Sequence, residues 1–563
     1  MEREKFRIPR SVQDAIPIRR IFADGIFQVG NQYSKTWSFT DINYAIAGKE
    51  DKTSMFLDYS ELLNALDSGA SAKITIYNRR INKAEFERSV LLPDKDDGLD
   101  EYRHEFNQML TAQVTGTSNS IVRERYLTVS VVKRNADEAR SYFARVGTDL
   151  VTHLAQLSSV AQELTLTERL HIFRDFFKAG EQAAAEFNIH EHAKRGQHFK
   201  DWFCPDSMEF AADHFKLDAR YGRVLYLQDF ASYIKDSFVS ELCDLDRDLM
   251  LSIDILPVPT DEAARQLQST LLGVETNVAN WQRRQNANNN FTATIPYDME
   301  LQRKETKEML DDLTTRDQRM MFGLVTLVHL ADSKEQLDSD TETLYSTARK
   351  HLCQLSTLRW QQKDGMDTVL PYGLRKIQVL RTLTTESTAV LIPFRAQEIM
   401  QPNGLYYGQN AVSKNMIVAD RRLLLNGNSF RLGVSGSGKS MSAKEEIVQI
   451  ALSTEDDILI LDPESEFGYL TEALGGEVIR ISATSDTHIN ALDMDRAYGD
   501  ERNPIVSKSE FVLSLFEQLI GDGMVTAKEK SILGRCTEQV YLPYIRNGYK
   551  GTPPTLQDFY RLL

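Results

Sequence analysis

Cysteine is scarce in this sequence of 563 residues, and its scarcity excludes two classes of scaffold. The four cysteines lie far apart, with no CxxC pair among them: Cys204, Cys243, Cys353 and Cys536. A disulfide framework or a zinc ribbon requires closely spaced pairs. We therefore expect reduced thiols and neither of these scaffolds.

A convincing set of metal ligands is also lacking. The histidines that come nearest to one are His190, His192 and His198, with Cys204 downstream. Their spacing matches none of the usual zinc ligand sets. A polar surface loop explains this segment more simply.

Long apolar runs are absent as well. No segment approaches the roughly 20 consecutive apolar residues that a membrane-spanning helix needs. The first residues, Met1–Lys5, lack the apolar core of a signal peptide. We therefore expect a cytoplasmic chain that lies at the inner face of the cell membrane only through partner proteins.

Positive charge is in deficit. Lysine and arginine number 66 against 81 aspartates and glutamates, which gives a net charge of −15. This balance disfavours a protein that coats nucleic acid over its whole surface. The pairs Lys194-Arg195 and Arg283-Arg284 leave a local DNA contact open, although a solvated helix face accounts for such pairs equally well.

The length predicts more than one hydrophobic core. Before residue 400 the pattern of strand, helix, strand, helix occurs twice, which indicates a large α+β region with two related halves. The predicted strands are Lys73–Tyr77, Tyr126–Val132, Leu249–Leu256 and Phe322–Leu330. A helix is predicted over Asp137–Leu157, a long helical stretch over Asp261–Met320 with a break at Asn286–Pro296, and another helix from Ser333. We predict domains over residues 1–160, 161–400 and 401–563.

One segment in the last of these domains identifies a ligand class. Gly433–Ser440 fits the phosphate-binding loop pattern G-x-x-x-x-G-K-[ST], so we expect ATP with Mg²⁺ to bind here. Lys439 would neutralise the β- and γ-phosphates, and the Ser440 hydroxyl would contact Mg²⁺. The expected binding residues are Gly433, Ser435, Gly436, Ser437, Gly438, Lys439 and Ser440.

The flanking residues support the match. A short strand is predicted at Phe430–Leu432, a helix over Met441–Leu452, and two further apolar strands at Ile458–Leu461 and Val478–Ile481. Strand, loop and helix thus follow in the order that a phosphate-binding loop requires. We predict an α/β P-loop NTPase domain.

A set of short motifs carries a resemblance to a known family. They are Ser38–Tyr44, Lys49–Asp51, Asp332–Asp338, Thr384–Ser387, Pro393–Arg395, Tyr406–Asn410, Asp462–Phe467 and Ile489–Asp493. With the phosphate loop, they make the chain resemble the conjugative-transfer ATPases of type IV secretion systems, the VirB-type motor family, in the branch common on mobile elements of bacteria. The resemblance spans nearly the whole chain.

The resemblance implies a RecA-like ATPase domain and a hexamer docked on the cytoplasmic face of a secretion channel. It implies that ATP hydrolysis powers channel assembly and the transfer of DNA or protein. The region before about residue 400 would then contact channel proteins and neighbouring subunits.

The acidic residues of the predicted site are less well defined. Asp462 as a Mg²⁺ contact and Glu464 as a catalytic carboxylate are the candidates, with Glu466 beside them. A strand end followed by a helix cap is the alternative interpretation of these residues. After Asp493 the pattern becomes helical, with two capping-box matches, Ser507–Glu510 and Thr526–Glu529. We expect the family's remaining core strands and acidic motif to lie beyond Leu563, which makes the RecA-like domain incomplete.

Two other functions remain open. One is a DNA-pumping ATPase of the septal translocase group, which is disfavoured because no membrane helix or DNA-reading terminal domain is predicted. The other is an interaction subunit that does not hydrolyse ATP, which the missing acidic strand favours.

Overall fold

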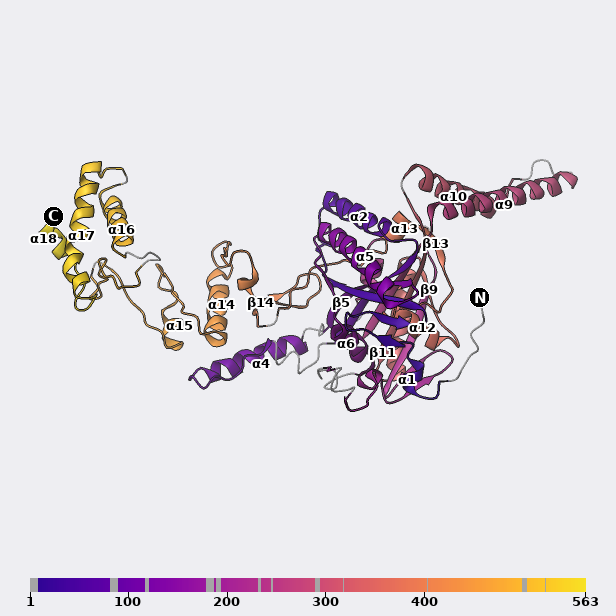
Figure 1. The fold of residues 1–563 in the computed structure, drawn as a ribbon, viewed down its shortest axis with the longest axis horizontal. Helices are drawn as coiled ribbons and strands as arrows, with labels where there is room; N and C mark the ends of the chain where they lie inside the picture. The colour runs from indigo at the N-terminus through magenta and orange to yellow at the C-terminus, as the bar shows by residue number, and fades with distance from the viewer. Residues whose placement is uncertain are drawn as a thin grey trace. The chain divides into compact units, whose positions relative to one another are not determined.

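The computed structural model describes residues 9–80, 90–116, 121–178, 187–188, 194–230, 234–244, 247–288, 294–316, 318–401, 403–482, 484–498, 504–521 and 523–563. The chain divides into two compact units, Met1–Ile458 and Leu459–Leu563 (Figure 1). These differ from the predicted domains, because residues on both sides of 160 share one sheet and the first unit extends past residue 400.

A single sheet of thirteen strands forms the framework of the first unit (Figure 1). Its strand order is β1-β2-β3-β5-β4-β10-β11-β9-β8-β7, while β6 pairs with β3, β12 with β9 and β13 with β11. The strands are β1 Arg20–Ile21, β2 Phe27–Val29, β3 Gln32–Phe39, β4 Ala70–Arg80, β5 Ile121–Val132, β6 Ala161–Glu163, β7 Met208–Phe210, β8 Phe215–Leu217, β9 Arg220–Asp229, β10 Leu249–Pro257, β11 Met320–Ala331, β12 Gln354–Thr357 and β13 Arg381–Thr384. The four strands predicted in this region are confirmed, since each lies within one of β4, β5, β10 and β11.

Helices lie between many of these strands in the sequence. They are α1 Val12–Ala15, α2 Lys49–Asn64, α4 Asp100–Gly116, α5 Ala136–Gln156, α6 Leu166–Phe177, η2 Phe199–Trp202, α8 Phe238–Leu242, α9 Thr260–Ala287, α10 Tyr297–Thr315, α11 Lys334–Lys350, α12 Gln362–Val369 and α13 Thr385–Ala389. The predicted helix start at Ser333 is confirmed, since its hydroxyl accepts a hydrogen bond from the Gln336 N–H at 3.2 Å.

The topology of the first unit repeats. A first set of elements runs β1, β2, β3, α2, β4, α4, β5, α5, β6, and a second runs β7, β8, β9, α8, β10, α9–α10, β11, α11, β12. The strand order is the same from either outer edge inward, and the two sets meet where β4 pairs with β10. At this junction Lys73 lies opposite Asp254, and its ammonium donates a hydrogen bond to that buried carboxylate at 3.0 Å.

Successive side chains along each strand point to opposite faces of the sheet, and a hydrophobic core lies on each face. In β10, Leu249, Leu251 and Ile253 pack into one core, whereas Met250 packs into the other. Helices α2 and α5 lie side by side on the first face, and α6 and α12 contribute to the second core (Figure 1). The two halves therefore share both cores.

The second unit is mainly helical. Its helices are α15 Gly468–Ala473, α16 Pro504–Ile520, α17 Ala527–Arg546 and α18 Leu556–Leu562. The capping box predicted at Thr526 is confirmed, with Glu529 as its reciprocal partner. The one predicted at Ser507 is wrong, because α16 already begins at Pro504 and Ser507 lies inside it.

Among the described helices of both units, none combines the length and the apolar composition needed to cross a lipid bilayer.

Candidate functional site

The predicted phosphate loop leads directly into a helix, α14, which spans Lys439–Ser453. The helix begins two residues before the predicted start, with Gly438 as its N-cap. Gly438 has φ +88° and Gly436 has φ +79°, which are left-handed conformations that side chains with a Cβ rarely adopt. The two glycines thus have the backbone freedom that the motif predicts.

The loop closes tightly on itself. A Cβ on Gly433 would lie 2.5 Å from the Ser437 hydroxyl oxygen, so any other residue there would require the Ser437 side chain to move. The Lys439 ammonium donates hydrogen bonds to the carbonyls of Gly433 at 2.6 Å and Val434 at 2.9 Å. The loop therefore brings together a lysine side chain, the N-terminus of a helix and glycine backbone in left-handed conformations. These groups suit binding of the phosphates of a nucleotide. Ser440, in the first turn of the helix, would supply the hydroxyl for Mg²⁺.

The three strands predicted around the loop are wrong. Phe430–Leu432, Ile458–Leu461 and Val478–Ile481 have no strand pairing. A strand needs hydrogen-bonded neighbours, and in the described part of this region the only sheet is the pair β14 and β15, spanning Leu405–Gln409 and Met416–Ala419. The apolar side chains are consequently exposed, by 91% at Leu432, 91% at Leu459 and 90% at Leu461.

Helix α14 is held against the hairpin β14–β15. The Gln449 side chain pairs with the backbone of Tyr406, accepting from its N–H at 2.7 Å and donating to its carbonyl at 2.8 Å. One turn earlier, Glu446 accepts a hydrogen bond from the Tyr407 hydroxyl at 2.8 Å. The buried Glu446 carboxylate also forms an ion pair with Arg431, two residues before the loop. The motif Tyr406–Asn410 thus packs against the helix that follows the phosphate loop.

The C-terminal end of α14 contacts α4 of the first half. Arg103 is fully buried, and its Nε–H donates to the Leu452 carbonyl at 3.0 Å. Lys95 Nζ donates to the Thr454 carbonyl at 3.3 Å. Cationic side chains at a helix C-terminus donate hydrogen bonds to its last carbonyls and interact favourably with the negative end of the helix dipole. Nearby, Leu110 packs with Val418 of β15.

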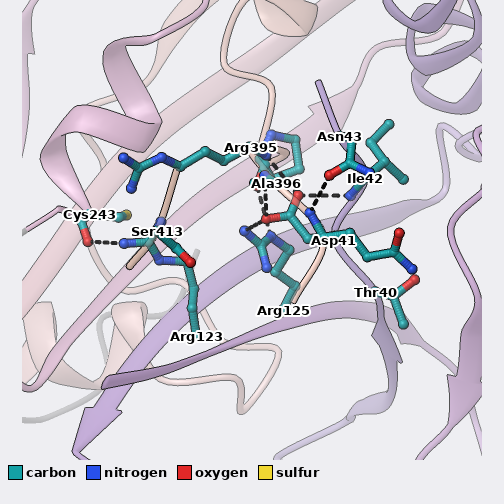
Figure 2. Close-up of polar contacts among 12 residues, drawn as sticks. Thr40, Asp41, Ile42, Asn43, Arg123, Arg125, Cys243, Arg395, Ala396 and Ser413 are labelled. Atoms are coloured by element: carbon teal, nitrogen blue, oxygen red, sulfur yellow. Dashed lines mark hydrogen bonds and ion pairs between the residues drawn. The ribbon is translucent and has the colours of Figure 1, made fainter. Parts of the chain in front are cut away.

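Two of the motif segments that carry the family resemblance meet in space. Figure 2 shows the Asp41 carboxylate between the Arg125 guanidinium and the backbone of Arg395 and Ala396. Asp41 Oδ1 accepts from the N–H groups of Ile42 at 2.9 Å and Arg395 at 2.7 Å, and Oδ2 accepts from Ala396 at 3.1 Å. The carboxylate thus anchors the start of the segment that leads to β14.

Neighbouring contacts extend this anchor. Arg125 Nε donates to the Pro393 carbonyl at 2.9 Å, and Asn43 Oδ1 accepts from the Gln397 N–H at 3.0 Å. The rings of Phe39 and Phe394 meet edge to face with centroids 5.7 Å apart. The sequence marked these segments as motifs without indicating that they touch. An acidic residue two positions after the end of a largely buried strand, β3, was the available signal.

The acidic candidates lie in a different unit from the loop. Asp462, Glu464 and Glu466 belong to Leu459–Leu563, whereas Gly433–Ser440 belongs to Met1–Ile458. Asp462 Oδ2 accepts the Phe467 N–H at 2.8 Å, and this bond, followed by those from Glu466, Glu464 and Ser465, lowers the pKa of the carboxyl. The Asp462 carboxylate therefore stabilises the turn that follows it by accepting hydrogen bonds from backbone N–H groups of that turn.

The described residues contain no group of three or more histidine, cysteine, aspartate or glutamate side chains placed to hold a metal ion. His198 caps the helix η2, accepting from the Lys200 N–H at 3.2 Å. Cys204 is buried, which raises the pKa of its thiol to about 12. His190 and His192 lie outside the described residues.

Comparison with known proteins assigns no family. No family model matches the chain, and no curated protein matches its sequence.

Proposed function

We propose that the chain is an ATP-binding motor subunit of a conjugative type IV secretion system, which couples ATP hydrolysis to channel assembly and to the transfer of DNA or protein. The observation that carries the proposal is the conformation of Gly433–Ser440, where two left-handed glycines and Lys439 converge at the start of α14. This arrangement has the chemistry of a phosphate site.

Each residue of the loop has a definite task in this proposal. The backbone N–H groups of Ser435–Gly438 would cradle the phosphates, Lys439 would neutralise their charge, and Ser440 would contact the Mg²⁺ ion. Bound MgATP would supply the phosphoryl bond whose cleavage drives the motor. The chain's own residues bind and orient this nucleotide.

The specific family assignment is supported by the motifs outside the loop. Ser38–Tyr44 and Pro393–Arg395 form one buried cluster, and Tyr406–Asn410 contacts the helix of the phosphate loop. These motifs therefore form a continuous connection from the large sheet to the loop. A motor needs such a connection, because nucleotide-driven changes at the loop must reach the part that contacts the channel.

The proposal extends to assembly and place. The subunit acts as a hexamer on the cytoplasmic side of the membrane, and it is held there by secretion-channel proteins that bind the sheet-containing unit. DNA is a transferred substrate rather than a ligand of the whole surface, since the net charge of −15 disfavours general DNA binding.

A second candidate is a nucleotide-binding assembly subunit that does not hydrolyse ATP. It is favoured by Asp462, whose carboxylate is engaged with the backbone of its own turn. In this role ATP would stabilise one arrangement of the subunit without being consumed.

Calorimetric titration of ATP with Mg²⁺ into the wild type, Lys439→Ala and Lys444→Ala tests the proposal. Removing a charge-assisted contact costs about 1.5–3 kcal/mol, so Lys439→Ala should bind roughly 10- to 150-fold more weakly. Lys444→Ala, on the same helix, should bind normally. Equal affinity of all three proteins contradicts the nucleotide site.

Phosphate release by the same proteins separates the two candidates. Turnover that depends on Lys439 favours the motor and directs attention to Glu464 and Asp462 as its carboxylates. Tight binding without turnover favours the assembly subunit.

A further inference from the structure

Glu446 is a buried carboxylate in the middle of α14, and three other segments of the chain meet at it. Its Oε1 accepts a hydrogen bond from the Tyr407 hydroxyl of β14 at 2.8 Å and forms an ion pair with Arg421. Arg421 opens the short 3₁₀ helix η3, which spans Arg421–Leu423. Its Oε2 forms an ion pair with Arg431, two residues before the phosphate loop. One carboxylate therefore joins α14 to the hairpin, to η3 and to the residues that enter the loop.

The residues that lead into the phosphate loop are not held by a sheet. No described strand pairs with Phe430–Leu432, and Phe430 and Leu432 are each 91% exposed. A segment without strand neighbours has no backbone ladder to fix its position. The ion pair between Arg431 and Glu446 attaches this segment to α14 in place of such a ladder.

Arg421 provides a second attachment at the same carboxylate. Its Nη1 donates a hydrogen bond to the Ser429 hydroxyl at 2.7 Å, and its Nη2 pairs with Glu446. Ser429 lies two residues before Arg431, so the entry of the loop is bound to Glu446 both directly and through Arg421. Loss of the Glu446 carboxylate would release both of these attachments.

The two guanidinium groups are directed away from the expected position of the phosphates. Glu446 follows Lys439 by seven residues, and an α-helix rises about 1.5 Å per residue, so about 10 Å of helix separates the two. Arg421 and Arg431 therefore act on the loop through Glu446. Their side chains are 30% and 34% exposed, so water can solvate them when the carboxylate is removed.

We propose that Glu446 is a positioning residue of the nucleotide site. It does not contact the phosphates. It holds the entry of the loop against α14, so that the N–H groups of the loop and the side chain of Lys439 face the same phosphates. The inference rests on the proposed nucleotide site, and it adds to that site a residue that the phosphate-loop pattern does not contain.

The sign of the effect on affinity separates positioning from simple electrostatics. ATP is an anion, so removal of a nearby carboxylate should by charge alone strengthen its binding. If Glu446 positions the loop, Glu446→Gln should instead weaken the binding of MgATP about tenfold, the factor that one charge-assisted hydrogen bond contributes. Glu445→Gln is the matched control, because it removes the neighbouring, more exposed carboxylate of the same helix. It should bind MgATP at least as tightly as the wild type.

Calorimetric titration with MgATP should also include Arg431→Gln, Arg431→Lys and the double variant of Glu446→Gln with Arg431→Gln. Arg431→Gln should weaken binding, and the double variant should bind no more weakly than Glu446→Gln, because both changes break the same attachment. Arg431→Lys keeps a cation for the carboxylate and should retain most of the affinity. The Arg431 side chain is partly exposed, so its variants test the attachment even if Glu446→Gln does not fold.

Unchanged or tighter binding by Glu446→Gln would overturn the positioning role, and so would losses from Glu446→Gln and Arg431→Gln that add in the double variant. If Lys439→Ala loses affinity while Glu446→Gln does not, this inference fails and the proposed nucleotide site stands. If the wild type itself binds no MgATP, both fail.

Discussion

The Asp41 carboxylate accepts a hydrogen bond from the backbone N–H of Arg395 at 2.7 Å, although the two residues are 354 positions apart in the sequence. The bond joins the end of β3, at the start of the first half, to the segment that follows the second half. The two halves and the chain leading to the phosphate loop are thus closed into one structure. An isolated buried carboxylate would be costly, but Arg125 lies against it as its counter-ion.

Asp41→Ala should destabilise the first unit strongly. The substitution leaves the guanidinium of Arg125 buried without its counter-ion and leaves the N–H groups of Arg395 and Ala396 without their acceptor. Breaking a buried ion pair in this way costs about 3–5 kcal/mol. Chemical denaturation followed by circular dichroism measures the loss.

The matched control for that substitution is Asp261→Ala. Asp261 pairs with Arg265 on α9, where both side chains are more than 70% exposed. Exposed pairs contribute about 0–1 kcal/mol, so this variant should unfold near the wild-type midpoint. Similar losses in the two variants would show that the Asp41 cluster does not anchor the fold.

Gly438→Ala should weaken ATP binding while leaving the fold intact. A Cβ at φ +88° is strained by about 1–2 kcal/mol, and relief of that strain would rotate the N–H groups of the loop away from the phosphates. Nothing lies within 4 Å of the added carbon, so packing is not disturbed. Calorimetric titration with MgATP measures the change.

Gly273→Ala, in the interior of α9, is the companion variant for Gly438. Its added carbon also meets nothing within 4 Å, but its backbone is helical, so alanine should stabilise the helix by about 0.5–1 kcal/mol. ATP affinity should not change. A loss of affinity in both variants would indicate a general effect of the substitution and not a demand for left-handed backbone at the loop.

Residue periodicity predicted much of the large sheet, and the reason is visible in β10. Leu249, Leu251 and Ile253 face one core while Met250 faces the other, so the strand is rich in apolar residues on both faces, although Ser252 and Asp254 interrupt the apolar run. The pairing of β4 with β10 was beyond prediction, because it depends on Lys73 and Asp254 meeting from strands 181 residues apart.

The segments around the phosphate loop show the opposite case. Ile458–Leu461 has the composition of a buried strand, yet composition cannot supply the neighbours that a strand requires. In the described residues no strand lies beside it, and Leu459 remains exposed. By contrast, the glycine positions of the loop were predictable, because a left-handed backbone is a local requirement that Gly436 and Gly438 meet on their own.

Stability of the first unit should fall as the pH drops below about 6.5, partly because of His329. Burial, followed by the charge of Arg223, lowers the pKa of this fully buried imidazole to about 3, and Asp338 opposes the shift. In the unfolded chain His329 has a pKa of about 6.5, so below this pH it is protonated there while it stays neutral in the folded chain. The free energy of unfolding therefore falls by up to about 1.4 kcal/mol per pH unit until the pH reaches the pKa of His329 in the folded chain.

Denaturation at several pH values between 7 and 4 should therefore show a shallower pH dependence in His329→Gln than in the wild type. His153→Gln, at a partly exposed position of α5, serves as the control for replacing an imidazole by an amide. Equal slopes for His329→Gln and the wild type would mean that this imidazole titrates normally in the folded protein.

Truncation after Gln401 should leave the large sheet folded but release α4. Both sheet cores are built from residues up to Phe394, so cooperative unfolding and the circular dichroism of the sheet should persist without nucleotide. Helix α4, however, would lose Val418 as the packing partner of Leu110 and the Leu452 carbonyl as the acceptor for buried Arg103. Limited proteolysis followed by mass spectrometry should then cut residues 90–116 in the truncated chain and spare them in the full one. Protection of α4 in both chains would show that it does not depend on the helix of the phosphate loop.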